Sequence, residues 1–203
     1  MYWFPNRPKL MTKVIFKAMD DPITGEYWSA EIKKKGDRLV LLFDGKHFRF
    51  MNRHKQEMRY KPPAGMLDEL HAMNLKGPCQ LDGELMHYHT KETKNFIYFY
   101  DIYVQDGEQV RELLSSRRKR LADLINMVSP CPLHFAQSDV WDIKSCLHGY
   151  GELFNEVIKC PEHEGLVFKN KNGMLEFDPI KSPDVPWMIK VRRPEKNHKI
   201  FER

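Results

Sequence analysis

The sequence lacks the features that mark membrane proteins and disulfide-rich secreted proteins. No uninterrupted apolar run approaches the ~18 residues that a membrane-spanning helix needs, so no membrane partner is expected. There are only four cysteines, Cys79, Cys131, Cys146 and Cys160, and they are scattered through the chain. No signal peptide opens the sequence. These absences favour a cytoplasmic protein with reduced thiols.

The sequence also has no large excess of charge of one sign. It contains 33 Lys and Arg against 28 Asp and Glu, which gives a formal net charge of +5. This moderate positive charge is compatible with a nucleic-acid partner and equally with many ordinary enzymes. No internal repeat or low-complexity tract interrupts the 203 residues. The length suits one compact domain over residues 1–203.

Short β-prone segments dominate the pattern of the chain. The Asp44-Gly45 pair predicts a hairpin, and the proline-rich opening at residues 5–8 predicts an extended lead-in. Strands are predicted at residues 27–32, 38–43, 48–51, 79–87, 95–104, 165–168, 174–177 and 187–191. Helices are predicted at residues 66–73, 107–128 and 150–158. The pattern indicates an α+β protein with largely antiparallel sheets and helices outside them.

The predicted helix at residues 107–128 carries a basic run, Arg117-Arg118-Lys119-Arg120. Apolar residues recur on one face of this helix, and the basic run projects largely from the other. Such a run is more often a solvated face than a binding site, so we interpret it as solvated.

Lys33 lies in the segment Glu31-Ile32-Lys33-Lys34-Lys35-Gly36-Asp37-Arg38. A lysine amine is a nucleophile only when neutral, and nearby cations or desolvation favour the neutral form. Lys34, Lys35 and Lys190 are candidates for those cations. Gly36 allows the backbone to approach a phosphate or ribose, and Arg38 offers a planar fork to phosphate oxygens. Taken alone, three lysines beside a turn more often form a solvated loop.

Four later segments supply groups that complement a nucleotide: Leu81-Asp82-Gly83-Glu84-Leu85, Tyr98-Phe99-Tyr100-Asp101-Ile102, Glu164-Gly165-Leu166-Val167-Phe168-Lys169 and Trp187-Met188-Ile189-Lys190-Val191-Arg192. Each has an ordinary alternative when read alone: a surface turn, a core aromatic, a strand-capping acid or a pair of surface cations. Five motifs in a fixed order are far less expected by chance than any one of them. The set therefore favours nucleotide chemistry.

Together these segments resemble the covalent nucleotidyltransferase superfamily of ATP-dependent DNA ligases, RNA ligases and messenger RNA capping enzymes. The family signature Lys-x-Asp-Gly-x-Arg is matched from Lys33 to Arg38, and the similarity extends over roughly residues 5–193. The opening Phe4-Pro5-Asn6-Arg7-Pro8 and the segment Asn52-Arg53-His54 are most similar to bacterial and phage DNA ligases. The resemblance implies an adenylation domain in a bacterial or phage-infected cell. Its fold would be two largely antiparallel sheets flanked by helices, in an ATP-grasp-like arrangement with a nucleotide cleft between the sheets.

The resemblance also implies an AMP-forming DNA ligase reaction that uses ATP and Mg²⁺. Lys33 would attack the α-phosphate of ATP and release pyrophosphate, and AMP would then move to the 5′-phosphate of nicked duplex DNA. A neighbouring 3′-hydroxyl would displace AMP and seal the strand. DNA repair, replication and recombination are the processes that need this reaction.

The resemblance assigns a role to each remaining site residue. In the ligases the residue two before the nucleophile reads the adenine amino group, and here that residue is Glu31. Arg38 and Arg53 would hold the ribose side and the 5′-phosphate of the strand. The other assignments are Glu84 to the ribose, Tyr100 to stacking on adenine, Glu164 to the metal, and Lys190 and Arg192 to the α-phosphate.

The sequence departs from the family pattern at three places. Lys35 stands where Asp is usual, and Arg192 stands where a second Lys is usual. The chain also ends about ten residues after the fifth segment, so the usual C-terminal oligonucleotide-binding barrel is expected to be absent. A monomer is expected, which is either a catalytic core cut from a longer enzyme or a free-standing core that needs a barrel domain or helper protein in trans. The alternatives are an RNA ligase core acting on RNA or a hybrid, or a catalytically impaired nucleic-acid-binding relative. A capping enzyme is disfavoured because Glu31 suits adenine.

Three pairs of Cys and His indicate a separate metal hypothesis. Cys131 and His134, Cys146 and His148, and Cys160 and His163 lie between or near the third and fourth motifs. Close Cys/His pairs can bind zinc, although spacing this irregular more often reflects buried thiols and surface imidazoles.

Overall fold

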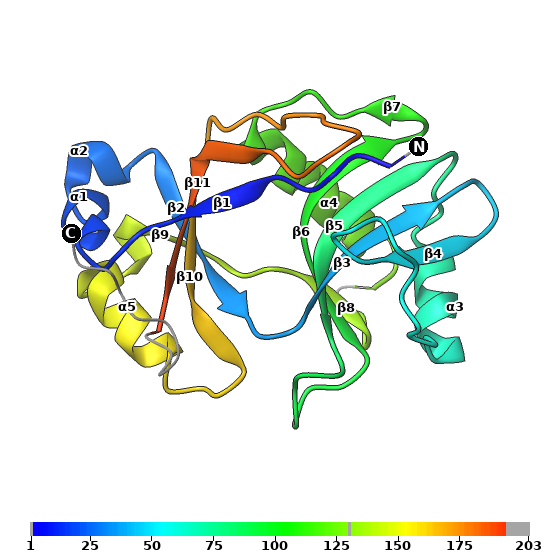
Figure 1. The fold of residues 1–203 in the computed structure, drawn as a ribbon, viewed down its shortest axis with the longest axis horizontal. Coiled ribbons are helices and arrows are strands. Elements are labelled where there is room, and N and C mark those ends of the chain that lie inside the picture. Colours follow the sequence, from blue (N-terminus) through cyan, green and yellow to red (C-terminus); the bar gives the residue numbers. More distant parts are fainter. Residues whose placement is uncertain (1, 130, 194–203) are drawn as a thin grey trace.

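The computed structural model describes residues 2–129 and 131–193, which form two β-sheets side by side with helices on their outer flanks (Figure 1). Strand bounds are β1 (Arg7–Leu10), β2 (Trp28–Lys34), β3 (Asp37–Phe43), β4 (Phe48–Met51), β5 (Cys79–Met86), β6 (Phe96–Gln105), β7 (Glu108–Gln109), β8 (Phe135–Gln137), β9 (Val140–Asp142), β10 (His163–Asn170) and β11 (Asp184–Arg192). The helices are α1 (Ile15–Met19), α2 (Pro22–Gly25), α3 (Ala64–Ala72), α4 (Leu114–Asn126) and α5 (Gly149–Val157), with a 3₁₀ turn, η1, at Ile143–Ser145.

The first sheet has the strand order β1-β11-β10-β2-β9. Its pairs are antiparallel except that β1 runs parallel to β11. Helices α1 and α5 cover its outer face, where Phe16, Tyr150, Phe154 and Phe168 form a buried cluster. Aromatic and β-branched side chains on alternate strand positions supply this core.

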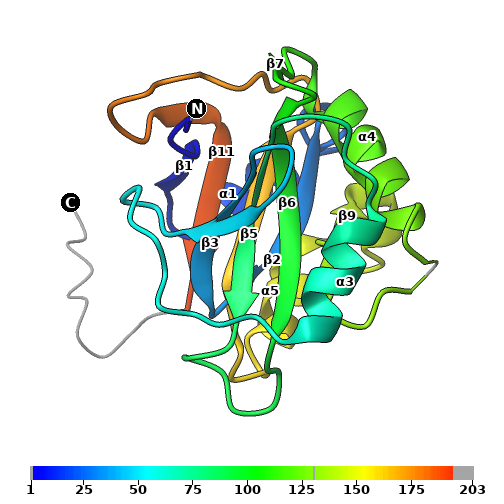
Figure 2. The same cartoon turned by 90° about the vertical axis from the view of Figure 1, so that its right-hand side faces the viewer.

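The second sheet has the order β4-β3-β5-β6-β7, and β8 pairs with β6 in parallel. Helices α3 and α4 lie on its outer face, away from the first sheet (Figure 2). Met66 and Leu70 of α3 and Leu121 and Leu124 of α4 pack against strand residues such as Phe99 in the larger core. Each sheet therefore has its own core, and their inner faces are left to form a cleft.

The chain passes from one sheet to the other in the short turn between β2 and β3. A Cβ at Gly36 would lie 2.5 Å from the carbonyl oxygen of Leu85 and 2.7 Å from Cγ of Glu84. Only glycine fits such a close approach to β5. The turn places Lys33 and Arg38 on either side of the junction between the two sheets.

These features confirm the predicted α+β class with two mostly antiparallel sheets, and two predicted elements need correction. The helix predicted at residues 107–128 begins only at Leu114, because the chain turns at Gly107, where φ is +87°, and Glu108–Gln109 then pair with β6 as β7. The strand predicted at residues 174–177 is irregular. There the Asn6 side chain binds the backbone of Glu176, with Nδ2 donating to its carbonyl at 2.7 Å and Oδ1 accepting from its N–H at 3.0 Å.

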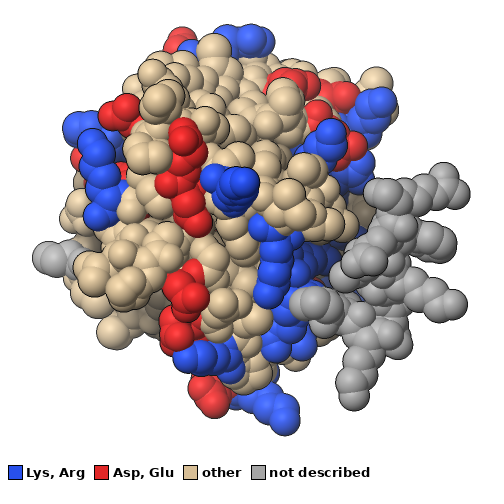
Figure 3. All heavy atoms as spheres, turned by 90° about the vertical axis from the view of Figure 1, so that its left-hand side faces the viewer, with Lys and Arg blue, Asp and Glu red and all other residues tan. Residues whose placement is uncertain are grey.

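The outer surface carries both signs of charge. Figure 3 shows the end of the molecule near α1, α2 and α5, where groups of Lys and Arg lie beside groups of Asp and Glu. The described side chains on this face therefore form no continuous patch of one charge. Within the described residues, every helix is too short or too polar to span a bilayer.

Candidate active site

A cleft of about 690 Å³ separates the inner faces of the two sheets. Cations outnumber carboxylates along its walls, which suits a polyanionic ligand. The basic lining residues are Arg7, Lys33, Arg38, Arg53, Arg59, Lys190 and Arg192, and the acidic ones are Asp37, Glu57, Glu84 and Glu164.

The register of the first sheet aligns the site residues in rows. Gly165 on β10 lies opposite Lys33 on β2 and opposite Arg192 on β11. In the next row of the same face, Val167 lies opposite Glu31 and Lys190. Because alternate residues of a strand share a face, Lys33, Lys190 and Arg192 reach the same cleft.

Glu164 is directed into the cleft by a bulge in β10. The pairing with β2 shifts register between His163 and Gly165, and Gly165 has a φ of +147°. A Cβ at Gly165 would lie 2.0 Å from the carbonyl oxygen of Val191, so only glycine fits there.

The Glu164 carboxylate contacts two cations of this row. Its Oε2 lies 2.5 Å from Nζ of Lys33 and 3.5 Å from Nε of Arg192. Mg²⁺ usually binds one or two carboxylates together with substrate phosphates, and the Glu164 carboxylate is of the type that such a site needs.

The Cys/His pairs of the described residues do not come together as a metal site. Residues 2–129 and 131–193 contain no group of three or more His, Cys, Asp or Glu side chains placed to hold a metal ion. All four cysteines are free. The zinc hypothesis therefore has no support from the geometry.

Glu84 on β5 faces the turn between β2 and β3. Its Oε1 accepts a hydrogen bond from the Gly36 N–H at 3.1 Å. Burial raises the pKa of Glu84 to about 7, although the nearby charges of Lys33 and Arg38 act in the opposite direction. A carboxyl group with this pKa changes its charge near neutral pH.

Arg38 is held by a partner that the sequence did not reveal, Asp82. Arg38 Nε donates to Asp82 Oδ1 at 2.5 Å, and Nη2 donates to Oδ2. The guanidinium also lies over the Tyr100 ring, 5.6 Å from its centroid. Its orientation in the cleft is therefore fixed from two sides, and three of its N–H groups remain for a ligand.

Lys190 lies among the cations of the cleft. Its pKa is lowered to about 8, mainly by burial and in addition by the charges of Arg192, Lys33 and Arg7. An anion bound here would relieve this repulsion. A phosphate group is the matching ligand.

Of the three lysines proposed to act on Lys33, Lys34 lies elsewhere. Its side chain points to the opposite face of β2, where Nζ is 3.3 Å from His163 Nε2 and 4.2 Å from the Tyr98 ring centroid. Burial lowers the pKa of Lys34. Strand alternation explains the difference, because neighbouring residues face opposite sides. Lys35 is exposed in the turn.

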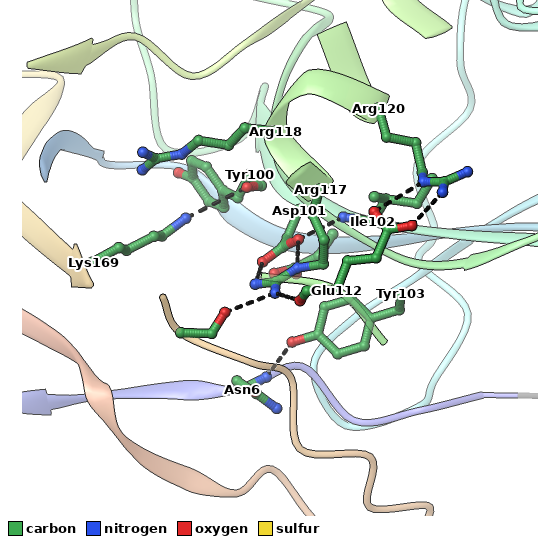
Figure 4. Close-up of polar contacts among 12 residues, drawn as sticks. Asn6, Tyr100, Asp101, Ile102, Tyr103, Glu112, Arg117, Arg118, Arg120 and Lys169 are labelled. Carbon is green, nitrogen blue, oxygen red and sulfur yellow. Dashed lines mark hydrogen bonds and ion pairs between the residues drawn. The ribbon is translucent and has the colours of Figure 1, made fainter. Parts of the chain in front are cut away.

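Glu31 is buried, with 2% of its surface exposed, and it already has two cationic partners. Arg118 Nη2 lies 2.7 Å from its Oε1, and Lys169 Nζ lies 2.8 Å from its Oε2. Lys169 also lies 5.4 Å from the Tyr100 ring centroid, and Figure 4 shows both side chains together with Arg118. The adjoining cavity of about 50 Å³ is far below the roughly 300–1,000 Å³ of usual ligand pockets. A purine base would have to widen it.

Only part of the basic run of α4 is the solvated face that the sequence indicated: Lys119 is exposed, whereas Arg117 and Arg118 turn inward. Arg117 is fully buried, with Nε 2.7 Å from Asp101 Oδ1 and Nη2 2.8 Å from Oδ2, and it also donates to the carbonyl oxygens of Glu112 and Gly173 (Figure 4). Arg118 is largely buried as well. One sequence signal pointed to this arrangement: Asp101 lies inside an apolar strand, and a buried carboxylate needs a cation.

Arg53 lines the outer part of the cleft on the side of the second sheet. It is exposed, and its Nε lies 3.1 Å from His54 Nε2. Arg59 and the half-exposed Tyr88 line the same region. The sequence-predicted site residues are thus divided between the outer cleft and the small cavity that continues it between the sheets.

Solved structures of polynucleotide ligases share this fold. A structure of Lig E DNA ligases matches with a TM-score of 0.62 and 17% identity over 95% of this chain and 70% of that one. A mycobacterial DNA ligase D complexed with ATP matches with a TM-score of 0.59 and 17% identity over 94% and 60%. An RNA ligase mutant of Naegleria gruberi, solved with AMP and Mn, matches with a TM-score of 0.54 and 15% identity over 95% and 57%.

The chain has the fold of the nucleotidyltransferase domain of ATP-dependent ligases. No protein-family model and no curated protein matches the sequence. The chain spans 57% to 70% of the lengths of the three ligase chains.

Proposed function

We propose that residues 1–203 are the nucleotidyltransferase core of an ATP-dependent polynucleotide ligase that seals nicks in DNA. The observation that carries this proposal is the position of Lys33. Its amine lies 2.5 Å from Glu164, in a cleft that also holds Arg192, Lys190 and Glu84. The ligase fold supports the same conclusion, because it is the scaffold of an ATP-bound ligase.

In the proposed first step the Lys33 amine attacks the α-phosphorus of ATP. An N–P bond forms, the P–O bond to the β-phosphate breaks, pyrophosphate leaves, and the proton released by the amine passes to solvent water in the open cleft. Lys190 and Arg192 hold the α-phosphate as negative charge develops on it. Mg²⁺ bound at Glu164 would neutralise phosphate charge. Glu84 accepts hydrogen bonds from the ribose, and Tyr100 packs against the base.

In the next steps the AMP moves to a 5′-phosphate end, and a 3′-hydroxyl displaces it. Arg53, at the outer end of the cleft, holds that 5′-phosphate. RNA is the alternative substrate, and the likeness to an RNA ligase favours keeping it in the test.

Covalent labelling tests this proposal. The protein is incubated with Mg²⁺ and ATP labelled at the α-phosphate, and we expect acid-labile label on the wild type that Lys33→Ala abolishes. Lys46→Ala is the matched control, because Lys46 lies exposed in the β3–β4 turn and outside the cleft. Nicked DNA, nicked RNA and labelled GTP are compared in parallel.

The outcomes of this experiment distinguish the proposed DNA ligase core from its alternatives. Label that persists in Lys33→Ala would show that another lysine is the nucleophile. If no label attaches but nicked duplex binds in a salt-sensitive way, the chain is a binding relative of the ligases, and the catalytic proposal is wrong. Sealing of nicked RNA but not nicked DNA would reassign the substrate.

A further inference from the structure

We propose that Arg118 is a positioning residue that holds Glu31 for reading the purine base and so sets the preference for ATP over GTP. This inference rests on the proposed function. It starts from the contact between Arg118 and Glu31. This contact links the second sheet and its helix α4 to the first sheet, beside the cavity of about 50 Å³ that Glu31 lines.

Arg118 crosses from one half of the molecule to the other. It belongs to α4, which packs on β6 of the second sheet, while its guanidinium reaches β2 of the first. There Nη1 lies 2.8 Å from Ser29 Oγ and Nη2 lies 2.7 Å from Glu31 Oε1. Ser29 and Glu31 lie on the same face of β2 because they are alternate residues. Two fixed contacts on a planar group define its orientation.

The backbone of Arg118 is held as well. Gln137 of β8 donates through Nε2 to the Arg118 carbonyl oxygen at 3.0 Å, so α4 is tied at this residue to the edge of the second sheet. Arg118 has 14% of its side chain exposed, and Glu31 has 3%. The pair is therefore shielded from solvent, where a charge-assisted hydrogen bond is strongest.

The arrangement leaves Glu31 able to accept further hydrogen bonds. A carboxylate offers about four acceptor positions. Arg118 uses one on Oε1 and Lys169 uses one on Oε2, so an acceptor position remains on each oxygen. An ionised carboxylate only accepts. It matches the amino group that adenine carries at its six-position, and it repels the carbonyl oxygen that guanine carries there.

Arg118 and Lys169 differ in how well each can hold the orientation of the Glu31 carboxylate. Lys169 is a flexible point charge whose amine also lies 3.4 Å from the Tyr100 carbonyl oxygen and near the Tyr100 ring, where the base would stack (Figure 4). A base entering the cavity would displace it. Arg118 approaches Glu31 from α4 instead and can stay in place when the base enters. Arg118 is thus the partner that sets the carboxylate angle in the bound state.

Nucleotide selectivity tests the inference. In Arg118→Gln we expect the KM for ATP in the labelling reaction to rise about tenfold, while kcat changes little, because a hydrogen bond to a charged group orients the base reader and not the reacting atoms. The preference for ATP over GTP should fall by about the same factor. Binding of ATP and GTP to the same variants carrying Lys33→Ala gives the comparison without chemistry.

Arg120→Gln is the matched control, since Arg120 is also on α4 but pairs with Glu112 at the surface and has no contact with β2. It should leave both KM and base preference unchanged. Ser29→Ala removes one anchor and keeps the guanidinium charge, and it should shift base preference in the same direction by a smaller factor. This second variant keeps the test valid if Arg118→Gln does not fold.

The outcomes separate this inference from the proposed function. If wild-type protein labels with ATP but Arg118→Gln and Ser29→Ala keep the wild-type preference, the inference is overturned and the proposed function stands. A lower Tm with equal losses for ATP and GTP would assign Arg118 a purely structural role. If the wild type neither labels nor binds a nucleotide, both proposals fail.

Discussion

Glu84 is the residue of the cleft whose charge depends most directly on pH. Burial raises its pKa from 4.5 to about 7, while Lys33 and Arg38 limit the rise. The folded-state pKa is above the unfolded one, so protonation of Glu84 stabilises the fold. This stabilisation is fully present below about pH 4.5 and is lost as pH rises through about 7. The full shift corresponds to at most about 3 kcal/mol.

We therefore expect Glu84→Gln to remove a pH dependence from both stability and binding. Wild-type stability should fall relative to the variant between about pH 4.5 and 7, as measured by denaturant unfolding across that range. The ATP affinity of the wild type should instead increase as the pH rises through 7, because the ionised Glu84 carboxylate accepts hydrogen bonds from the ribose. Parallel pH profiles for the two proteins would contradict this role for Glu84.

One carboxylate, that of Glu162, accepts four hydrogen bonds from the loop between β5 and β6. Glu162 Oε1 accepts from the N–H groups of Lys91, Glu92 and Thr93 at 3.0 to 3.2 Å, and Oε2 accepts from the Thr93 hydroxyl at 2.7 Å. Burial alone would raise the pKa of Glu162, but these hydrogen bonds lower it below its usual range. The Glu162 carbonyl oxygen also accepts from the N–H of Lys35, two residues after Lys33.

Glu162→Ala should destabilise the protein, because several backbone donors of the loop lose their acceptor. We expect a loss of about 2 kcal/mol, or about 4–8 °C in Tm for a chain of this size. The control is Glu156→Ala, which removes only an exposed ion pair with Lys159 and should change Tm by about 1 °C or less. Since the folded pKa of Glu162 is lowered, the difference between wild type and Glu162→Ala should shrink as pH falls below about 4.5. An equal Tm for the two variants at neutral pH would show that the loop is held by other contacts.

Sequence periodicity predicted the strands that pair along their length within a sheet. Residues 79–87 and 95–104 are dense in β-formers, and they form β5 and β6 almost as expected. The predicted strand at residues 174–177 failed because its backbone partner is the Asn6 side chain, distant in sequence. The alternation of apolar residues at 174–177 is the same whether or not a neighbouring strand pairs with them, so periodicity cannot distinguish a paired strand from an irregular segment.

The candidate site was predictable where a motif fixes both residue type and position. Lys33, Glu164 and Arg192 were named from their motifs, and the sheet register brings them together. Their proposed roles stay predictions. Arg118 and Asp82 were missed, because their importance depends on which charged group lies opposite them in the folded chain. A basic run on a helix looks the same whether its partners are water or buried carboxylates.

Over the whole molecule the formal net charge is +5, and the cleft between the sheets has an excess of cations of its own. Seven cations and four carboxylates line that cleft. The end face in Figure 3 carries anions beside its cations, so attraction for a nucleic acid is not expected to be uniform over the surface. Binding to nicked duplex should therefore depend on few phosphate contacts, and individual cleft cations should contribute measurably.

Arg53 provides the sharpest test of this view, because it is exposed at the outer cleft wall and the proposed function assigns it to the 5′-phosphate. Arg53→Gln should make the slope of log Kobs against log salt less steep by about 0.9, the value for one lost phosphate contact. It should also abolish any preference for a nick with a 5′-phosphate over one with a 5′-hydroxyl. Lys119→Gln should change neither quantity, since Lys119 is exposed on the outer helix α4 and pairs with Asp123. If Arg53→Gln and Lys119→Gln behave alike, the duplex binds elsewhere, and the cleft serves the nucleotide alone.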